Sequence, residues 1–291
     1  MPDCPVIDTH VHLWDPASIR YPWLDGNTLL DRPYLLDDYH QAFQGIDVRA
    51  MVFVQCEAEF SAYAREAAWV AQQALAESRL KAMVAWAPLE KGRAVEADLA
   101  ILKQHSLLRG VRRIIQFEDD IDFCLRPAFI EGVRTLAEHG LSFDICIDYR
   151  HMANILKFVA ALPEVPMILD HIGKPSIRDG TMQPWASQMR ELARLPNLFC
   201  KISGVATEAA ADWTPEQLRP FVDVAFDAFG FDRTMFGGDW PVTLQAITPQ
   251  RWVRFLDDAL AGTSASQRRR FWHDNAVRCY RIPVQTAEST K

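Results

Sequence analysis

Two histidines separated by one residue follow the first apolar run of the chain, in the segment Asp8-Thr9-His10-Val11-His12. The run itself, Val6 to Asp8, predicts a short β-strand. Because side chains alternate along a strand, His10 and His12 point the same way and can bind one metal ion at the strand's end. Histidines at this spacing also occur as hydrogen-bonded core residues, so the pair indicates hydrolytic chemistry only together with other polar residues nearby.

Two such residues end predicted strands later in the chain. His171 ends the sixth strand, and Asp239 follows the eighth. In a parallel barrel the carboxyl ends of all strands meet at one face, so His10, His12, His171 and Asp239 can share one site.

The elements that must position these residues follow a repeating pattern of short apolar runs and longer helical stretches, which is typical of strand-helix units around a parallel sheet. The eight predicted strands are Val6 to Asp8, Ala50 to Gln55, Ala82 to Ala87, Gly110 to Ile115, Ser142 to Ile147, Met167 to Asp170, Leu198 to Ile202 and Thr234 to Phe236. The predicted helices are Ser61 to Glu77, Ala94 to His105, Pro127 to His139, His151 to Leu162, Trp185 to Leu195 and Pro215 to Phe229. The pattern predicts an α/β protein with a single (β/α)8 TIM barrel over residues 1–283 and a polar tail at 284–291. The segment Trp14 to Tyr39 is predicted to be a long loop over the active face.

Composition excludes several classes of protein. The net charge of -7 and pI near 5.6 argue against a nucleic-acid surface, and the basic run Arg268 to Arg270 is interpreted as a solvated helix face. We find no apolar run of the ~20 residues that a membrane span requires and no signal peptide. The six cysteines have no C-x-x-C spacing, which favours free thiols and a cytoplasmic protein. Glycine-rich nucleotide-binding motifs are absent from the sequence.

Three motifs resemble the amidohydrolase superfamily, and within it the lactonase branch. They are Asp-Thr-His-Val-His-Leu-Trp from Asp8, Leu-Asp-His-Ile-Gly-Lys-Pro from Leu169 and Phe-Gly-Gly-Asp-Trp-Pro from Phe236. The resemblance runs from Val6 to about Tyr280. It implies that His10 and His12 are ligands of a divalent metal, that Asp239 is the base that activates water, and that His171 is a further ligand or a donor to the substrate carbonyl.

The metal centre implied by the resemblance departs from that of two-metal relatives. The lysine or glutamate that bridges their ions has no counterpart here, because the fourth strand offers Arg112 and Arg113 and the fifth ends Cys146-Ile147-Asp148. We therefore expect one ion, with zinc favoured by its preference for imidazole. The same residues also allow a metal-free acid and base, as relatives differ in whether they need a metal.

Other charged residues are candidates with two interpretations each. Glu57 is either a further oxygen ligand or substrate contact, or a loop carboxylate. At most one of Arg112 and Arg113 faces the inside of the barrel, where it would hold a carbonyl or carboxylate. Lys201, between apolar neighbours, either lines the site or forms a structural ion pair.

Tryptophans beside the active face are also candidates for substrate binding. Trp14 and Trp240 would pack against the C-H faces of a sugar ring, or else belong to the core.

The function predicted is hydrolysis of a small sugar-acid lactone, with the lactone as small-molecule substrate, no nucleic-acid or membrane partner, and an oligomeric state that the sequence does not give. One alternative is a hydrolase or decarboxylase for a carboxylated intermediate of aromatic degradation, such as a pyrone dicarboxylate, which would need more basic residues in the pocket. A second alternative is a non-catalytic barrel that binds a metal or a sugar acid, and the presence of Asp239 argues against it.

Overall fold

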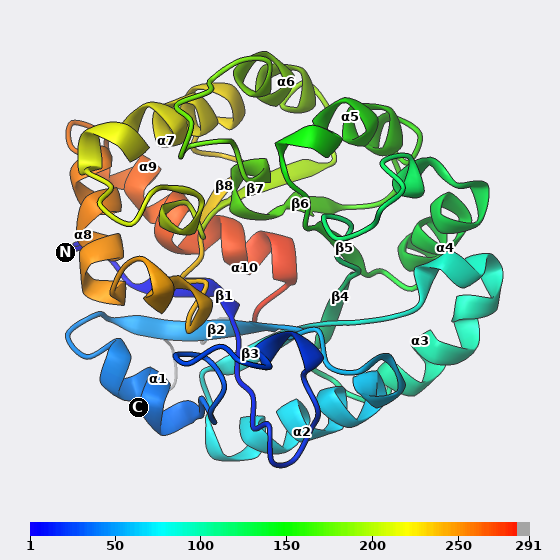
Figure 1. Ribbon diagram of the computed structural model, residues 1–291. Helices are drawn as coiled ribbons and strands as arrows, with labels where there is room; N and C mark the ends of the chain where they lie inside the picture. The colour runs from blue at the N-terminus through cyan, green and yellow to red at the C-terminus, as the bar shows by residue number, and fades with distance from the viewer. Residues whose placement is uncertain (284–291) are drawn as a thin grey trace, which may run out of the picture.

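Eight parallel strands, arranged in the order β1 to β8, form a barrel with helices around its outside (Figure 1). This computed structural model describes residues 1–283, so the tail predicted at 284–291 lies outside the described residues. The strands are β1 Val6–Val11, β2 Val48–Val54, β3 Leu80–Ala85, β4 Leu108–Arg112, β5 Ser142–Ile145, β6 Met167–Leu169, β7 Leu198–Ile202 and β8 Thr234–Phe236. The α-helices are α1 Leu36–Ala42, α2 Tyr63–Ala76, α3 Glu96–Leu102, α4 Pro127–Glu138, α5 Met152–Ala160, α6 Trp185–Leu192, α7 Pro215–Phe229, α8 Pro249–Ala259, α9 Ala265–Arg269 and α10 Asn275–Tyr280. The predicted TIM barrel is confirmed.

The barrel closes where β1 meets the segment after β8. Val11 and Trp240 form a parallel bridge there. The His12 amide donates to the Trp240 carbonyl (2.8 Å), and the Asp239 amide donates to the His10 carbonyl (2.8 Å). The first and last strands are therefore joined through residues of the predicted site.

Helix α10 covers the barrel interior at the other end from these residues, and it crosses the centre of the ring in Figure 1. Ala276, Cys279 and Tyr280 of α10 pack in one cluster with inward-facing residues such as Ala82 and Met235. The Tyr280 hydroxyl donates to Asp144 Oδ2 of β5 at 2.7 Å. The interior is thus a packed core, as expected of a barrel of this size.

The structure corrects some predicted boundaries. β1 continues to Val11, so His10 lies inside the strand, and the register against β2 shifts between Asp8 and Val11. The segment predicted to be a loop from Trp14 to Tyr39 ends in a helix, because α1 begins at Leu36. Its first turn is held by the Asp38 carboxylate, which accepts from the Leu35 amide (2.9 Å), a local capping contact that apolar periodicity does not detect.

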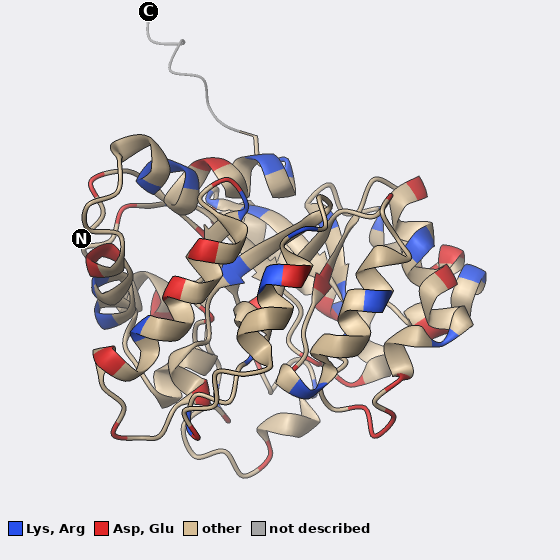
Figure 2. Cartoon of the chain, turned by 90° about the horizontal axis from the view of Figure 1, so that it is seen from above, with Lys and Arg blue, Asp and Glu red and all other residues tan. Residues whose placement is uncertain are grey.

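Helix ends that carry strong local signals agree with the prediction. α7 begins at Pro215, and Thr214 and Gln217 form a capping box before it. The basic run Arg268 to Arg270 forms ion pairs with Asp3, Asp274 and Asp232, as expected of a solvated helix face. Figure 2 shows basic and acidic residues interspersed along the helices. Within residues 1–283, every helix is too short or too polar to span a bilayer.

Candidate active site

A pocket of about 450 Å³ opens where the strands end at their carboxyl termini. His12, Arg112, His171 and Asp239 line its floor and are almost completely buried. This is the face on which the chemistry of a (β/α)8 barrel is built, because loops from every strand converge there.

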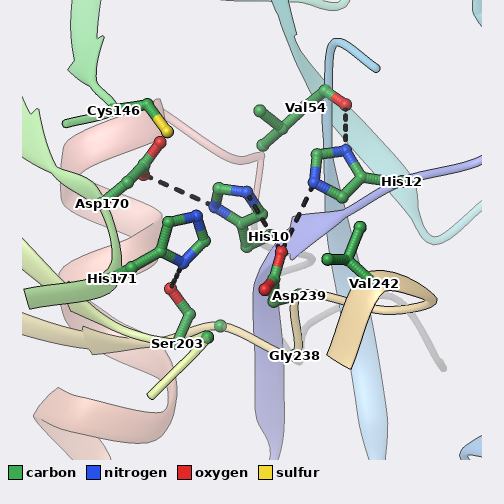
Figure 3. Close-up of polar contacts among 12 residues, drawn as sticks. His10, His12, Val54, Cys146, Asp170, His171, Ser203, Gly238, Asp239 and Val242 are labelled. Carbon is green, nitrogen blue, oxygen red and sulfur yellow. Dashed lines mark hydrogen bonds and ion pairs between the residues drawn. The ribbon is translucent and has the colours of Figure 1, made fainter. Parts of the chain in front are cut away.

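His12 is oriented by the neighbouring strand. Its Nδ1 lies 2.8 Å from the carbonyl oxygen of Val54, so Nδ1 carries the proton and donates it (Figure 3). The lone pair of Nε2 then faces Asp239, whose Oδ1 lies 3.5 Å away. Burial lowers the pKa of His12, which keeps the ring neutral near pH 7.

Asp239 lies in a left-handed turn directly after β8, with φ 53°. Burial alone would raise the pKa of Asp239, but His171, His12 and Lys174 hold this pKa below its usual value. The carboxylate is therefore ionised at neutral pH and can accept a proton.

His171 lies opposite, also with φ 53°, in the turn after β6. Its Nδ1 is 2.9 Å from the Ser203 hydroxyl, and its ring centroid is 4.5 Å from that of His10. Gly204 makes this approach possible, because a Cβ there would lie 2.6 Å from His171 Nδ1 and 2.9 Å from Asp239 Oδ2. His171 and Asp239 both adopt the left-handed backbone conformation, which is costly for a residue other than glycine and is held by the surrounding structure.

His10 lies below the other histidines and is completely buried. Its Nε2 is 3.8 Å from Asp239 Oδ1, and its Nδ1 is 3.4 Å from Asp170 Oδ1. Burial, followed by the charges of Lys201, His12 and Arg112, lowers the pKa of His10 well below its usual value. The structure thus brings together all four residues that the sequence predicts to share a site.

These donors suit a divalent ion. One nitrogen each of His10 and His12 and one oxygen of Asp239 lie within 4.8 Å of one another. Tetrahedral zinc with bonds of about 2.0–2.1 Å would need ligand atoms roughly 3.4 Å apart. The Oδ1 atom of Asp239 lies 3.5 Å from His12 Nε2 and 3.8 Å from His10 Nε2, which is close to that separation. The proton of His12 on Nδ1 leaves its other nitrogen free to coordinate, as in many histidine ligands.

Comparison with known proteins agrees with the resemblance to amidohydrolases seen in the sequence motifs. The sequence model of the family described as "Amidohydrolase" matches residues 7–282. The chain belongs to the amidohydrolase family.

Several relatives of this amidohydrolase match nearly the whole chain. An L-fucono-1,5-lactonase from Burkholderia multivorans is 33% identical over 95% of this chain and 96% of its own length. An L-rhamnono-gamma-lactonase from Scheffersomyces stipitis is 25% identical over 95% of this chain and 98% of its own. A crystal structure of an amidohydrolase from Burkholderia multivorans with bound zinc superimposes with a TM-score of 0.87 at 31% identity, covering 96% of this chain and 100% of that one.

Arg112, the last residue of β4, and Arg113, which follows it, point to opposite sides, as the alternation of side chains along a strand requires. Arg112 lines the pocket, donates to the Gln55 carbonyl (2.6 Å) and lies 3.2 Å from His10 Nε2. Arg113 points away and pairs with Glu118 at 2.5 Å, so of the two candidate arginines Arg112 faces the pocket and Arg113 does not.

Lys201 lies below the pocket and does not line it. Its Nζ is 2.6 Å from Asp144 Oδ2 and 3.1 Å from Asp170 Oδ1, and all three side chains are fully buried. The interpretation of Lys201 as a structural ion pair therefore holds, and its predicted contact with substrate does not.

The two tryptophans predicted to bind substrate belong to the core of the active-face loops. Trp14 donates from its indole to the Arg32 carbonyl (2.9 Å), and Trp240 packs edge-on against Tyr34 and Tyr39. Both are fully buried and lie outside the pocket lining. Trp23, from the same loop, lines the mouth instead.

Glu57 lines the pocket with φ 53° but lies outside both potential metal clusters of the described residues. The Gln55 side chain donates to its carboxylate (2.6 Å). The structure therefore favours a substrate contact for Glu57 over a metal ligand.

Three important residues escaped the sequence analysis. Asp170 pairs with Lys201, Lys174 lines the pocket with φ 44°, and Asp8 accepts from the amides of His10 (3.1 Å) and Gly238 (2.7 Å). All three belong to the motifs that contain the histidines and Asp239, so their proximity to the predicted ligands was the available signal.

Glu66 of α2 supports the pocket wall and gives a first prediction. Its carboxyl accepts from the Cys56 amide (3.1 Å), beside Glu57, and burial raises the pKa of Glu66 from 4.5 to about 8. The folded state thus holds this proton more tightly than the unfolded state. The resulting stabilisation is complete below pH 4.5 and is lost as the pH rises through 8.

When the pH is raised from 5 to 9, we expect the free energy of unfolding of Glu66→Gln to increase by roughly 2 kcal/mol relative to that of the wild type. One pKa unit corresponds to about 1.4 kcal/mol, and the expected value is smaller than the full shift would give because the protein can relax around the charge. Urea unfolding at the two pH values measures this difference. The exposed Glu131→Gln on α4 is the control and should show the wild-type pH dependence. Equal pH dependence in all three proteins would contradict the prediction.

Proposed function

We propose that this amidohydrolase opens a small sugar-acid lactone by adding water to the ester carbonyl. The observation that carries the proposal is the buried Asp239 carboxylate on the floor of the pocket, whose Oδ1 lies 3.5 Å from His12 Nε2 and 3.8 Å from Nε2 of His10 beneath it. It is supported by relatives named L-fucono-1,5-lactonase from two Burkholderia species, at 33% and 30% identity.

The residues of the floor divide the chemistry between them. Asp239 takes a proton from water as the oxygen attacks the carbonyl carbon, and it returns that proton to the ring oxygen when the ester bond breaks. The Arg112 guanidinium, which donates only, stabilises the negative charge that develops on the carbonyl oxygen. Water and lactone give one hydroxy acid, which releases a proton at neutral pH.

A divalent ion, when bound, would polarise the carbonyl and lower the pKa of water. His10, His12 and Asp239 would hold it, and we propose zinc because imidazole and carboxylate suit that ion and a relative was crystallised with bound zinc.

The charges of the pocket favour a neutral substrate. Its lining contains two side-chain cations, Arg112 and Lys174, against the carboxylates of Glu57, Glu59 and Asp239. A pyrone dicarboxylate would bring two further negative charges into this space, at a cost of like-charge repulsion. The excess of carboxylates over cations in the pocket lining therefore argues against the carboxylated aromatic substrate, which was the alternative given by the sequence.

The mouth of the pocket is apolar. Trp23, Phe60 and Phe117 line it and are 40%, 58% and 73% exposed. Aromatic faces there can cover the C-H face of a sugar ring or a methyl group. Fuconic and rhamnonic acids, the acids in the names of the relatives, both end in a methyl group, which fits such a wall.

The test is hydrolysis of a panel of aldonolactones, followed as proton release near neutral pH. L-Fucono- and L-galactonolactone form a matched pair, because they differ only in a terminal methyl or hydroxymethyl group. We expect turnover of both, with a kcat/KM about 3- to 10-fold higher for the methyl compound, as expected for one group in an apolar subsite. Turnover of pyrone dicarboxylate without turnover of any aldonolactone would overturn the proposal. No turnover of either class would favour the non-catalytic barrel.

The same assay after treatment with a strong chelator, and again after addition of zinc, tests the metal. Loss and recovery of turnover would support the metal-assisted reaction, and unchanged turnover would assign the chemistry to Asp239 and the histidines alone. Six free cysteines support a further proposal that the enzyme works in a reducing cytoplasm. The sugar-acid lactonases among its relatives support a proposed place in carbohydrate catabolism.

A further inference from the structure

Arg112 approaches the nitrogen of His10 that a metal ion would need. Its Nη1 lies 3.2 Å from His10 Nε2, and its Nη2 donates to the Gln55 carbonyl at 2.6 Å. Both groups are buried, and a guanidinium can only donate hydrogen bonds. The contact therefore uses the lone pair of Nε2, which is also the lone pair that would coordinate a cation together with His12 and Asp239.

The contacts of His10 leave one consistent arrangement of its proton. Each ring nitrogen faces a cation, because Lys201 Nζ lies 3.3 Å from Nδ1 and Arg112 faces Nε2. A neutral imidazole offers a single acceptor, so one nitrogen must donate elsewhere. Asp170 Oδ1 lies 3.4 Å from Nδ1, whereas Asp239 Oδ1 lies 3.8 Å from Nε2, so we assign the proton to Nδ1, on the side of the nearer carboxylate, and the lone pair to Nε2.

The Arg112 side chain can remain close by when it leaves His10. Its second amino group is anchored to Gln55, and its Nη1 is also 3.6 Å from Asp170 Oδ2, an oxygen with no other hydrogen bond among the described residues. A small rotation of the guanidinium would exchange the His10 contact for the Asp170 carboxylate.

We infer that Arg112 and a divalent cation compete for the single lone pair of His10 Nε2. Cation binding then requires Arg112 to turn away, and Arg112 weakens metal affinity beyond the general effect of its charge. The inference rests on the metal site of the proposed function and goes beyond it, because it makes one residue both a group that touches substrate and an antagonist of the metal.

The experiment compares zinc affinities of wild type, Arg112→Met and Lys174→Met, each stripped of metal and titrated with zinc against a chromophoric chelator. Lys174 is the matched control, since it lines the same pocket and its charge acts on His10, His171 and Asp239 without a hydrogen bond to His10. We expect Arg112→Met to bind zinc at least 10-fold more tightly than wild type, and Lys174→Met to change less than 3-fold. Equal tightening in both variants, or no tightening in Arg112→Met, would overturn the inference.

A measurement on wild type covers the case in which Arg112→Met does not fold. Hydrogen exchange of the Arg112 guanidinium, followed by NMR, should change in rate on addition of zinc as its contact with His10 is exchanged for one with Asp170. Unchanged exchange at saturating zinc would overturn the inference. Lactone turnover is not measured in either experiment, so failure here is distinct from failure of the proposed function.

Discussion

Replacing Asp239 with asparagine is expected to lower kcat for lactone hydrolysis by about 10³-fold, the usual contribution of a general base. The substitution keeps the shape of the side chain and removes the group that accepts the proton from water. Asparagine tolerates the left-handed conformation of this position, and the backbone contacts of residue 239 to His10 and Thr243 are unaffected. The fold is therefore expected to survive, which circular dichroism and thermal unfolding would verify.

Glu57→Gln is the matched control for this variant. Glu57 is also acidic, lines the same pocket and has φ 53°, yet it lies outside both potential metal clusters. We expect it to lose no more than about 10-fold in kcat/KM, as for a lost substrate hydrogen bond. Wild-type kcat in Asp239→Asn, with zinc affinity measured separately, would show that the base lies elsewhere.

Replacing Lys201 with methionine is expected to destabilise the protein by roughly 3–5 kcal/mol, the usual cost of removing one partner from a buried ion pair. Burial would lower the pKa of Lys201, but Asp144 and Asp170 raise it, so the ammonium is charged inside the barrel. Without it, both carboxylates remain buried, with Tyr280 beside Asp144 and with Arg112 (3.6 Å) and the neutral His10 ring (3.4 Å) beside Asp170. Urea unfolding at pH 7 measures the loss.

Two further variants separate the ion pair from the loss of a side chain. Adding Asp144→Asn to Lys201→Met removes one of the abandoned charges and should recover part of the stability. Lys157→Met, at an exposed position of α5, should change stability by less than about 0.5 kcal/mol. Failure of the double variant to recover any stability would show that the loss came from packing and not from charge.

The four donors of the site were predictable from the sequence because one geometric rule locates them. Residues at the carboxyl ends of parallel strands converge whatever their separation in the chain, and His10, His12, His171 and Asp239 all occupy such positions. The separation of Arg112 from Arg113 was predictable in the same way, since neighbouring residues of a strand point to opposite faces.

Depth within the barrel was not predictable from alternation. Lys201 and Ser203 lie two residues apart at the end of β7, a separation of about 6.6 Å along a strand. Ser203 contacts His171 beside the pocket, whereas Lys201 meets Asp144 and Asp170 in the layer below. The position of a residue in these layers depends on the stagger of all eight strands, which no single segment encodes.

The burial of individual residues in the loop after β1 could not be predicted from the sequence for a related reason. Trp14 and Trp23 belong to one loop, yet the first is buried and the second lines the mouth of the pocket. Long-range contacts decide this outcome, such as the Trp23 indole donating to the Cys56 carbonyl (2.7 Å). Apolar periodicity carries no information about such contacts.

The seam between β1 and the segment after β8 has a consequence for the synthesis of the enzyme. It joins residues from the two ends of the chain, such as Asp8 and Gly238, which are 230 positions apart. A nascent chain on the ribosome therefore carries the three histidines of the site, His10, His12 and His171, well before Asp239 is translated. The proposed metal site and the proposed base are complete only when the segment after β8, which contains Asp239, has been translated, so unfinished chains are expected to lack the proposed reaction.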